Sequence, residues 1–199
     1  MFELSTFEDD VRVTPENIGG KKEDSVSRSL IQKYENRIFP DIGVVLSITK
    51  VLDVKGGTIR VDDPGIYYNA KFEAMVFTPR LHEVVEGTVI DITDFGVFVR
   101  FGPIDGLCHI SQVVNDYVSR DPKANVLVAK KSGRTLKIGD IVRARITAIS
   151  LEKKEVNKIS LTMRQPGLGS LEWLEMDRKE AEKASRKKDD KEVTKESKK

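Results

Sequence analysis

The chain has 199 residues, 39% of them hydrophobic, and its 34 basic and 32 acidic residues give a formal net charge of +2. This length allows one or two domains with ordinary cores, no apolar run approaches a membrane span, and the acidic start MFELSTFEDD lacks the order of a secretory signal. The single cysteine, Cys108, excludes an internal disulfide framework and fits a cytoplasmic protein.

The first half predicts a helix packed on a small antiparallel sheet. Alternation predicts a first strand over 2–13, and apolar residues at helical spacing predict a helix that is capped by the side-chain oxygen of Asp24 or Ser25 and ends at about Phe39. Further strands are expected over 43–52, 58–61 and 66–77, separated by a glycine turn at 56–57 and a polar turn at 62–65. The pattern indicates an α+β domain over residues 1–80.

The second half predicts an all-β barrel. Five short strands are expected over 86–93, 95–101, 104–110, 140–151 and 157–163, within a domain at 81–170. The connection over 115–137 is long enough to be functional or to hold structure of its own. Its basic cluster of Lys130, Lys131 and Arg134 is interpreted as solvated charge.

A C-terminal extension is expected over 171–199. Trp173 is interpreted as an anchor that fixes this segment to the barrel or to a partner. Beyond about residue 177 the mixed charges and low apolar content predict a disordered or loosely helical segment.

Charge is distributed unevenly between the two halves. Residues 1–81 carry 11 basic and 13 acidic groups, whereas residues 82–165 carry 13 and 10. A nearly neutral chain is not a strong generic binder of polyanions, so any electrostatic footprint for nucleic acid is expected on the second half.

Five segments of the second half resemble the S1 RNA-binding domain. These segments are EGTV at 86–89, DFGVFV at 94–99, DGLCHIS at 105–111, KIGDIVRARI at 137–146 and KISLT at 158–162. The resemblance implies a five-stranded OB-fold barrel whose aromatic side chains stack on unpaired bases.

The whole chain up to about Trp173 resembles the E-prime component of archaeal RNA polymerase, the counterpart of the seventh subunit of eukaryotic RNA polymerase II. The segments that carry this resemblance are KFEAMVFTP at 71–79, DYVS at 116–119, TMRQP at 162–166 and LEW at 171–173. The resemblance implies that the first half is a truncated RNA-recognition-like fold. It lacks the aromatic motif with which such domains bind RNA, so we interpret it as a docking domain.

The candidate RNA-binding residues follow from the S1 resemblance. Strict alternation places Phe98 and Arg100 on the outer face but Phe95 on the core side; the resemblance implies a bend at Gly96 that brings Phe95 outward. His109 is assigned to the same face, with a half-buried structural histidine as the alternative. Arg100 and Lys158 are candidate phosphate contacts, with solvated surface charge as the alternative.

No metal site or cofactor is expected, because His109 has no partner at metal-ligand spacing and no nucleophile or phosphate-loop motif is present. Docking to the polymerase is predicted for two loops, Gly19-Gly20 and Pro64-Gly65. The partner interface is predicted to include Val84 and Val85.

The resemblance implies a non-catalytic subunit of an archaeal, DNA-directed RNA polymerase in the cytoplasm. It implies a stalk formed with a small helical partner, the F component of the same polymerase, that docks on the polymerase core near the clamp. It also implies binding of emerging single-stranded RNA during initiation, elongation and termination. The alternative is an S1-containing accessory subunit of an RNA-processing or translation-initiation complex; an enzyme is the third possibility.

Overall fold

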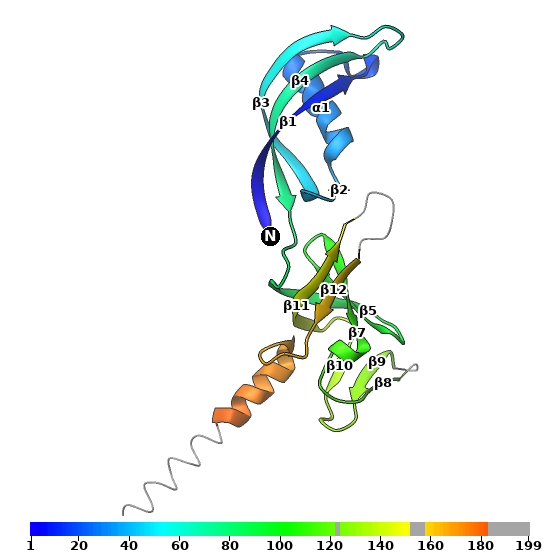
Figure 1. Ribbon diagram of the computed structural model, residues 1–199, viewed down its shortest axis with the longest axis vertical. Helices are drawn as coiled ribbons and strands as arrows, with labels where there is room; N and C mark the ends of the chain where they lie inside the picture. The colour runs from blue at the N-terminus through cyan, green and yellow to red at the C-terminus, as the bar shows by residue number, and fades with distance from the viewer. Residues whose placement is uncertain (122–123, 152–157, 183–199) are drawn as a thin grey trace, which may run out of the picture. The chain divides into compact units, whose positions relative to one another are not determined.

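The computed structural model describes residues 1–121, 124–151 and 158–182, with Lys158 described by its backbone alone. The chain forms two compact units, the first mainly Met1–Arg80 and the second Leu81–Ile149 with the segment that begins at Lys158. Each unit has its own sheet and core (Figure 1).

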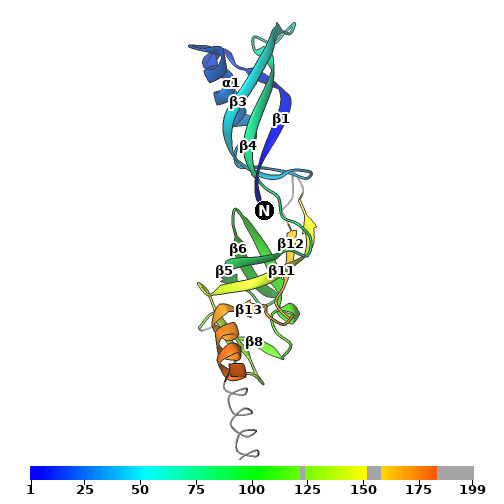
Figure 2. The same cartoon turned by 90° about the vertical axis from the view of Figure 1, so that its left-hand side faces the viewer.

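The first unit is one helix on a four-stranded antiparallel sheet (Figure 2). The sheet order is β1 (Phe2–Val13), β4 (Ile66–Phe77), β3 (Gly43–Ile59) and β2 (Arg37–Phe39). A 3-10 turn, η1 (Pro15–Asn17), leads into helix α1 (Lys22–Tyr34). The helix buries Val26 and Leu30 against Phe72 and the other inward side chains of the sheet.

Helix α1 ends five residues earlier than the sequence predicts. Asn36 adopts a positive φ of 57°, which stops the helix, and the next three residues form β2 against β3. The expected side-chain cap is also wrong: Lys21 is the N-cap and provides no side-chain hydrogen bond, whereas Asp24 lies in the first turn. There its carboxylate is favourably placed at the positive end of the helix.

Strand β3 does not end at the predicted turn. It runs through Gly56 and Gly57 to Ile59, because β4 supplies a partner along this whole length. The two glycines adopt φ values of 74° and 140° at a break in register, so they form a bulge within the hairpin.

The second unit is a closed five-stranded barrel, as predicted. The strands are β5 (Val84–Ile92), β6 (Gly96–Phe101), β7 (Ile104–His109), β11 (Ile141–Ser150) and β12 (Lys158–Thr162). Their order is β12-β7-β6-β5-β11, and pairing of β12 with β11 closes the cylinder. The 3-10 turn η2 (Ile110–Gln112) follows β7. The short strand β13 (Gly169–Ser170) pairs antiparallel with β11.

The long connection between β7 and β11 holds a separate three-stranded antiparallel sheet. Its strands are β8 (Val118–Asp121), β9 (Val126–Ala129) and β10 (Thr135–Lys137), in the order β10-β9-β8. Leu127, Ala129 and Leu136 are buried on one of its faces. We call this element the inserted sheet.

Trp173 fixes the C-terminal helical residues, 171–182, to the second unit. Its side chain is only 5% exposed, and its indole N–H donates to the carbonyl of Thr135 at 3.0 Å. The guanidinium of Arg134 lies over its ring and pairs with Asp177, one turn further along. Trp173 therefore attaches the C-terminal helix to strand β10 of the inserted sheet. The segment predicted to be disordered or loosely helical begins at about residue 177; it is helical up to residue 182, and residues 183–199 lie outside the described chain.

Replacing Trp173 with Ala is expected to lower the free energy of unfolding by about 3–5 kcal/mol, because a large buried aromatic is lost. The measurement is urea unfolding followed by circular dichroism, since the variant has no tryptophan fluorescence. Glu172→Ala, at an exposed neighbouring position, serves as the control and is expected to change stability by less than about 0.5 kcal/mol. An unchanged unfolding midpoint for Trp173→Ala would contradict the anchor.

Candidate nucleic-acid interface

Two phenylalanine rings meet on the outer surface of the barrel, where β5 turns into β6. Phe95 is 52% exposed, Phe98 is half-buried, and their ring centroids are 6.0 Å apart at an interplanar angle of 87°. An edge-to-face pair restrains the orientation of both rings. The surface therefore offers a pre-positioned aromatic platform for a planar ligand.

Phe95 faces outward because it lies in a turn and escapes the alternation of the strand. Strand β6 begins at Gly96, and the turn is closed by the N–H and the hydroxyl of Thr93, which both donate to the Gly96 carbonyl. The Phe95 carbonyl in turn accepts the N–H of Ile110 at 3.0 Å. This is the bend that the S1 resemblance implied and that period-two alternation alone did not.

Gly96 sets the spacing of the two strands at this point. It pairs with His109, and a Cβ on Gly96 would lie 2.4 Å from the Cys108 carbonyl oxygen. Only glycine permits so close an approach of β6 to β7. The backbone contact thus brings the aromatic pair and His109 to neighbouring places.

His109 is exposed at the end of β7, with its ring fixed by Ser111. The backbone N–H of Ser111 donates to Nδ1, and the Ser111 hydroxyl lies 2.8 Å from the same nitrogen. Because Nδ1 accepts, the neutral ring carries its proton on Nε2. That N–H is a donor suited to a phosphate or a base edge. We call Phe95, Phe98 and His109 the aromatic face.

The candidate phosphate contact Arg100 already has an anionic partner. It lies on the same side of β6 as Phe98, and its guanidinium makes two hydrogen bonds to Asp105 directly opposite, at 2.7 and 3.0 Å. The pair is exposed, so a phosphate that contacts Arg100 must share it with the carboxylate. The side chain of Lys158 lies outside the described residues.

Other arginines of the second unit are paired in the same way. Arg120 lies 3.0 Å from Asp94 and Arg134 lies 2.5 Å from Asp177. Arg143 lies 2.7 Å from Glu86. Arg100 and Arg143 on the barrel strands, like Arg120 and Arg134 of the inserted sheet, therefore each lie beside a carboxylate.

The loop predicted to dock lies at one end of the first unit. Asp63 organises it: its carboxylate binds Arg12 at 2.6 and 2.7 Å, the Tyr67 hydroxyl at 2.6 Å and the Gly65 N–H at 2.8 Å. The Arg12 guanidinium, with these other donors, holds the pKa of Asp63 well below its usual range. We call residues 59–65 the docking turn.

The predicted docking residues share this end of the sheet, because the last residue of β1, Val13, pairs with Ile66 at the start of β4. Gly19, Gly20 and Pro64 are exposed, whereas Gly65 is buried against Arg12. Sequence reasoning missed Val61, which is 91% exposed, and its neighbour Ile59. The sequence signal that could have identified them is an apolar residue next to the polar turn predicted at 62–65.

Of the two residues predicted for the partner interface, only Val84 is exposed. Val85 is only 7% exposed, because alternation along β5 points it into the barrel core opposite Ala144. A surface role for Val85 is therefore wrong. The larger apolar surface that sequence reasoning missed lies in the first unit, where Phe2, Leu4 and Met75 are exposed on paired strands β1 and β4.

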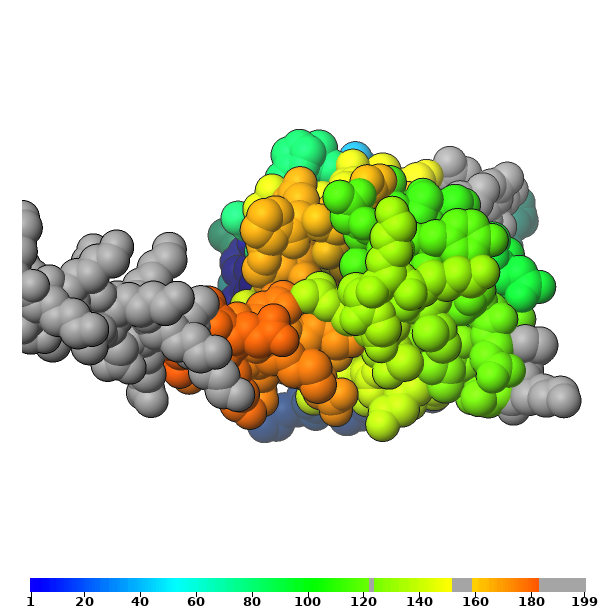
Figure 3. All heavy atoms as spheres, turned by 90° about the horizontal axis from the view of Figure 1, so that it is seen from below, coloured from blue at the N-terminus to red at the C-terminus, as the bar shows by residue number. Residues whose placement is uncertain are grey.

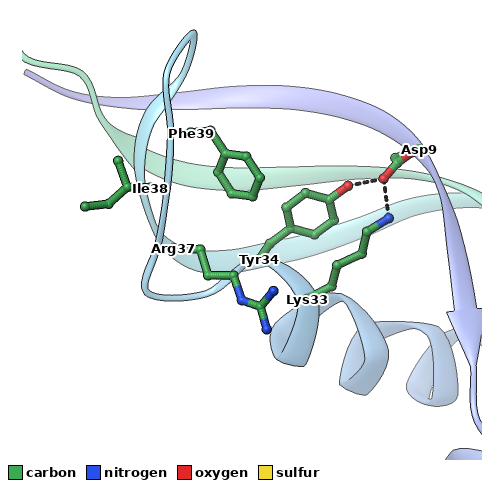
Figure 4. A pocket seen from close by; sticks show the side chains of 6 residues that line it. All are labelled: Asp9, Lys33, Tyr34, Arg37, Ile38 and Phe39. Atoms are coloured by element: carbon green, nitrogen blue, oxygen red, sulfur yellow. Dashed lines mark hydrogen bonds and ion pairs between the residues drawn. The ribbon is translucent and has the colours of Figure 1, made fainter. Parts of the chain in front are cut away.

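A pocket of the first unit, about 610 Å³ in volume, lies between the end of α1, β1 and β2 (Figure 4). Lys33 and the Tyr34 hydroxyl both bind the Asp9 carboxylate across it. Burial alone would raise the pKa of Asp9, but these two donors outweigh it and the pKa is lowered. The polar groups satisfy one another, so the network ties the helix to the sheet.

Among the described residues, no group of three metal-ligating side chains is present, and no helix is long and apolar enough to cross a membrane. Burial raises the pKa of the Cys108 thiol to about 12, which keeps it protonated and inert.

Two family models match successive parts of the chain. One, described as an SHS2 domain found in the N terminus of Rpb7p/Rpc25p/MJ0397, covers residues 8–65, and the S1 RNA binding domain covers residues 78–164. DNA-directed RNA polymerase subunit Rpo7 of Sulfolobus acidocaldarius is 37% identical over 183 residues, which are 92% of this chain and all of the relative. The chain belongs to the Rpo7 family.

Two further relatives match only part of the chain. DNA-directed RNA polymerase III subunit RPC8 of Saccharomyces cerevisiae is 33% identical over 99 residues, half of this chain and 47% of the relative. Ribonuclease R of Vibrio cholerae is 39% identical over 77 residues, 38% of this chain but only 9% of the enzyme. The likeness to the nuclease is thus confined to a short module, whereas the likeness to Rpo7 extends over both units.

Replacing Gly96 with Ala is expected to destabilise the protein by about 1–3 kcal/mol, because the new Cβ forces β6 and β7 apart. It is also expected to weaken RNA binding, since the same shift displaces Phe95 from His109. Urea unfolding and fluorescence anisotropy with labelled RNA measure the two effects. Gly19→Ala is the control, because a Cβ there meets nothing within 4 Å; equal stability of the two variants would contradict the close approach.

Proposed function

We propose that this chain is a non-catalytic stalk subunit of DNA-directed RNA polymerase that binds single-stranded RNA as it leaves the enzyme. The first unit docks on the polymerase core, and the aromatic face of the second unit receives the transcript. A small helical protein is the partner within the stalk. The full-length similarity to Rpo7 is the observation that carries this proposal.

The alternative, an accessory subunit of an RNA-processing or translation-initiation complex, receives less support. S1 modules occur in such proteins, and the ribonuclease relative illustrates this. A module alone explains only the second unit. The first unit and its connection to the barrel are accounted for by the polymerase family alone among the relatives described above.

The aromatic face suits a transcript of any sequence. Every base has a π-face, so stacking on Phe95 and Phe98 tolerates sequence change, and the Nε2 proton of His109 adds one polar contact. Because Arg100 is shared with Asp105, we infer that the isolated chain binds RNA weakly. Attachment to the polymerase raises the effective concentration of the transcript and makes weak contacts sufficient.

Two further surfaces are assigned to protein partners. The docking turn presents the exposed side chain of Val61 on a loop that hydrogen bonds hold in place. A side chain held in this way is suited to enter a pocket on a partner. The exposed patch of Phe2, Leu4 and Met75 and, on the second unit, Val84 are assigned to the small stalk partner. Exposed apolar patches of this kind mark protein-interaction sites.

Replacing Phe98 with Ala is expected to weaken binding of single-stranded RNA by about 1–3 kcal/mol, the loss of one stacking ring. Anisotropy titration with labelled oligouridylate measures it. Phe98→Tyr keeps the ring and is expected to bind as the wild type does. Unchanged affinity in a folded Phe98→Ala variant would remove the barrel face from the RNA path.

Replacing Val61 with Asp is expected to reduce association with the polymerase core by at least about tenfold, because burial of an apolar side chain is lost and a charge must be desolvated. Co-purification with core subunits measures it. Ile138→Asp, an equally drastic change at an exposed isoleucine of the second unit, is the control. Normal assembly of Val61→Asp would exclude the docking turn, and RNA affinity is expected to stay unchanged.

A further inference from the structure

The inserted sheet carries an aromatic side chain that the barrel site does not use. Tyr117 immediately precedes β8 and is 66% exposed, more than Phe95 or Phe98 of the aromatic face. The ammonium of Lys130 lies 4.7 Å from the centroid of its ring. A ring with a cation beside it is the combination with which proteins hold single-stranded nucleic acid.

The turn that holds these lysines is pre-organised by one carboxylate. Asp116 accepts the backbone N–H groups of Tyr117, Lys131 and Ser132 at 2.6, 2.8 and 2.9 Å. The N–H of Ser132, with that of Lys131, lowers the pKa of Asp116, so it stays ionised. Because its oxygens are occupied by backbone donors, the carboxylate organises the turn without pairing with a lysine.

The charges at this turn differ from those on the barrel. Within the described part of the chain, neither Lys130 nor Lys131 forms an ion pair, and both are exposed. Arg134 of the same turn is bound to Asp177, and the barrel arginine Arg100 is bound to Asp105. Two lysines without an ion pair therefore lie in the turn that contacts Tyr117. Figure 3 shows the inserted sheet, in yellow-green, on the face of the second unit that is seen there.

This surface is connected to the aromatic face. Arg120, three residues after Tyr117, reaches from β8 to Asp94 at 3.0 Å, and Asp94 immediately precedes Phe95. Three residues of a strand span about 10 Å. By the other route, the eight residues from His109 to Tyr117 span at most about 28 Å. One OB fold binds about 4–16 nucleotides of single-stranded nucleic acid, and an extended RNA of that length covers either separation.

We propose that Tyr117, Lys130 and Lys131 form a second RNA-contact site, which receives a nucleotide beyond those on the aromatic face. The exposed face of the tyrosine stacks on an unpaired base, and the lysines contact the flanking phosphates. Exposed lysines are depleted at the cores of protein–protein interfaces, so nucleic acid fits this surface better than a protein does. The inference rests on the proposed RNA-binding function and extends it from one site to a path.

The test compares a short and a long RNA on the full chain. Labelled oligouridylates of about 5 and about 16 nucleotides represent the two ends of the range for one OB fold. Tyr117→Ala is expected to lower affinity for the long RNA by about 5- to 100-fold, the effect of one lost stacking ring, and to leave the short RNA unaffected. Tyr117→Phe is expected to bind both as the wild type does.

The salt dependence gives a second readout. Lys130→Gln and Lys131→Gln are each expected to reduce the slope of log affinity against log salt by about 0.7 for the long RNA, since each releases one phosphate contact. Lys179→Gln removes the same charge from an exposed position on the C-terminal helix and is expected to leave the slope unchanged. Thermal unfolding of each variant confirms that the fold is intact.

The outcomes separate this inference from the proposed function. An unchanged affinity of Tyr117→Ala for the long RNA, with Phe98→Ala weakened for both RNAs, overturns the second site and leaves RNA binding by the barrel standing. A loss in Tyr117→Ala for the long RNA with no effect of Phe98→Ala supports the second site and overturns the barrel face. If the wild-type chain binds neither RNA, RNA binding by the barrel and by the second site are both wrong, whereas membership of the polymerase family is unaffected.

Discussion

The close pairing of Gly96 with His109 is the constraint on which the aromatic face depends. The missing side chain lets β6 approach the backbone of Cys108 within a distance that no other residue allows. That approach fixes where β6 begins, and the turn before it is then free to direct Phe95 outward. One absent methyl group thus decides whether the ring joins the core or the surface.

Compensated charge is the second feature that shapes the surface. Cross-strand pairs such as Arg100–Asp105 and Arg143–Glu86 are exposed, so each contributes little to stability. Their effect on binding is larger, because a phosphate gains little where the cation already has a carboxylate. For the proposed RNA binding, the barrel therefore relies on stacking, which holds RNA without reading its sequence and is weakly sensitive to salt.

Much of the fold could be predicted from the sequence where local signals agreed. The strands at 2–13 and 66–77 match the structure because alternation and flanking breakers pointed to the same limits. The end of α1 could not be predicted, because pairing of β2 with β3 overrode an apolar pattern that still looked helical. The continuation of β3 through two glycines likewise depended on a partner strand that sequence periodicity does not reveal.

The site was less predictable than the fold, for reasons that differ between residues. Alternation assigned Phe98 correctly and Phe95 wrongly, because Phe95 lies in a turn; only the family resemblance supplied the bend. The pairing of Arg100 with Asp105 was available from the sequence, since a two-residue turn at Gly102 and Pro103 places them opposite each other. Val85 was assigned to the surface against its own alternation, which pointed it into the core.

The arrangement of contacts has a consequence for a moving ligand. Strong anchoring at any single point would hold a transcript in place, because residence time rises with the affinity of each contact. In the proposed function, several modest contacts in series, rings on the barrel and a ring with lysines on the inserted sheet, let one nucleotide leave while its neighbours stay bound. Together these contacts retain the RNA, whereas no individual contact prevents its movement. The proposed attachment through the docking turn of the first unit is the permanent one, so the RNA surface is free to remain weak.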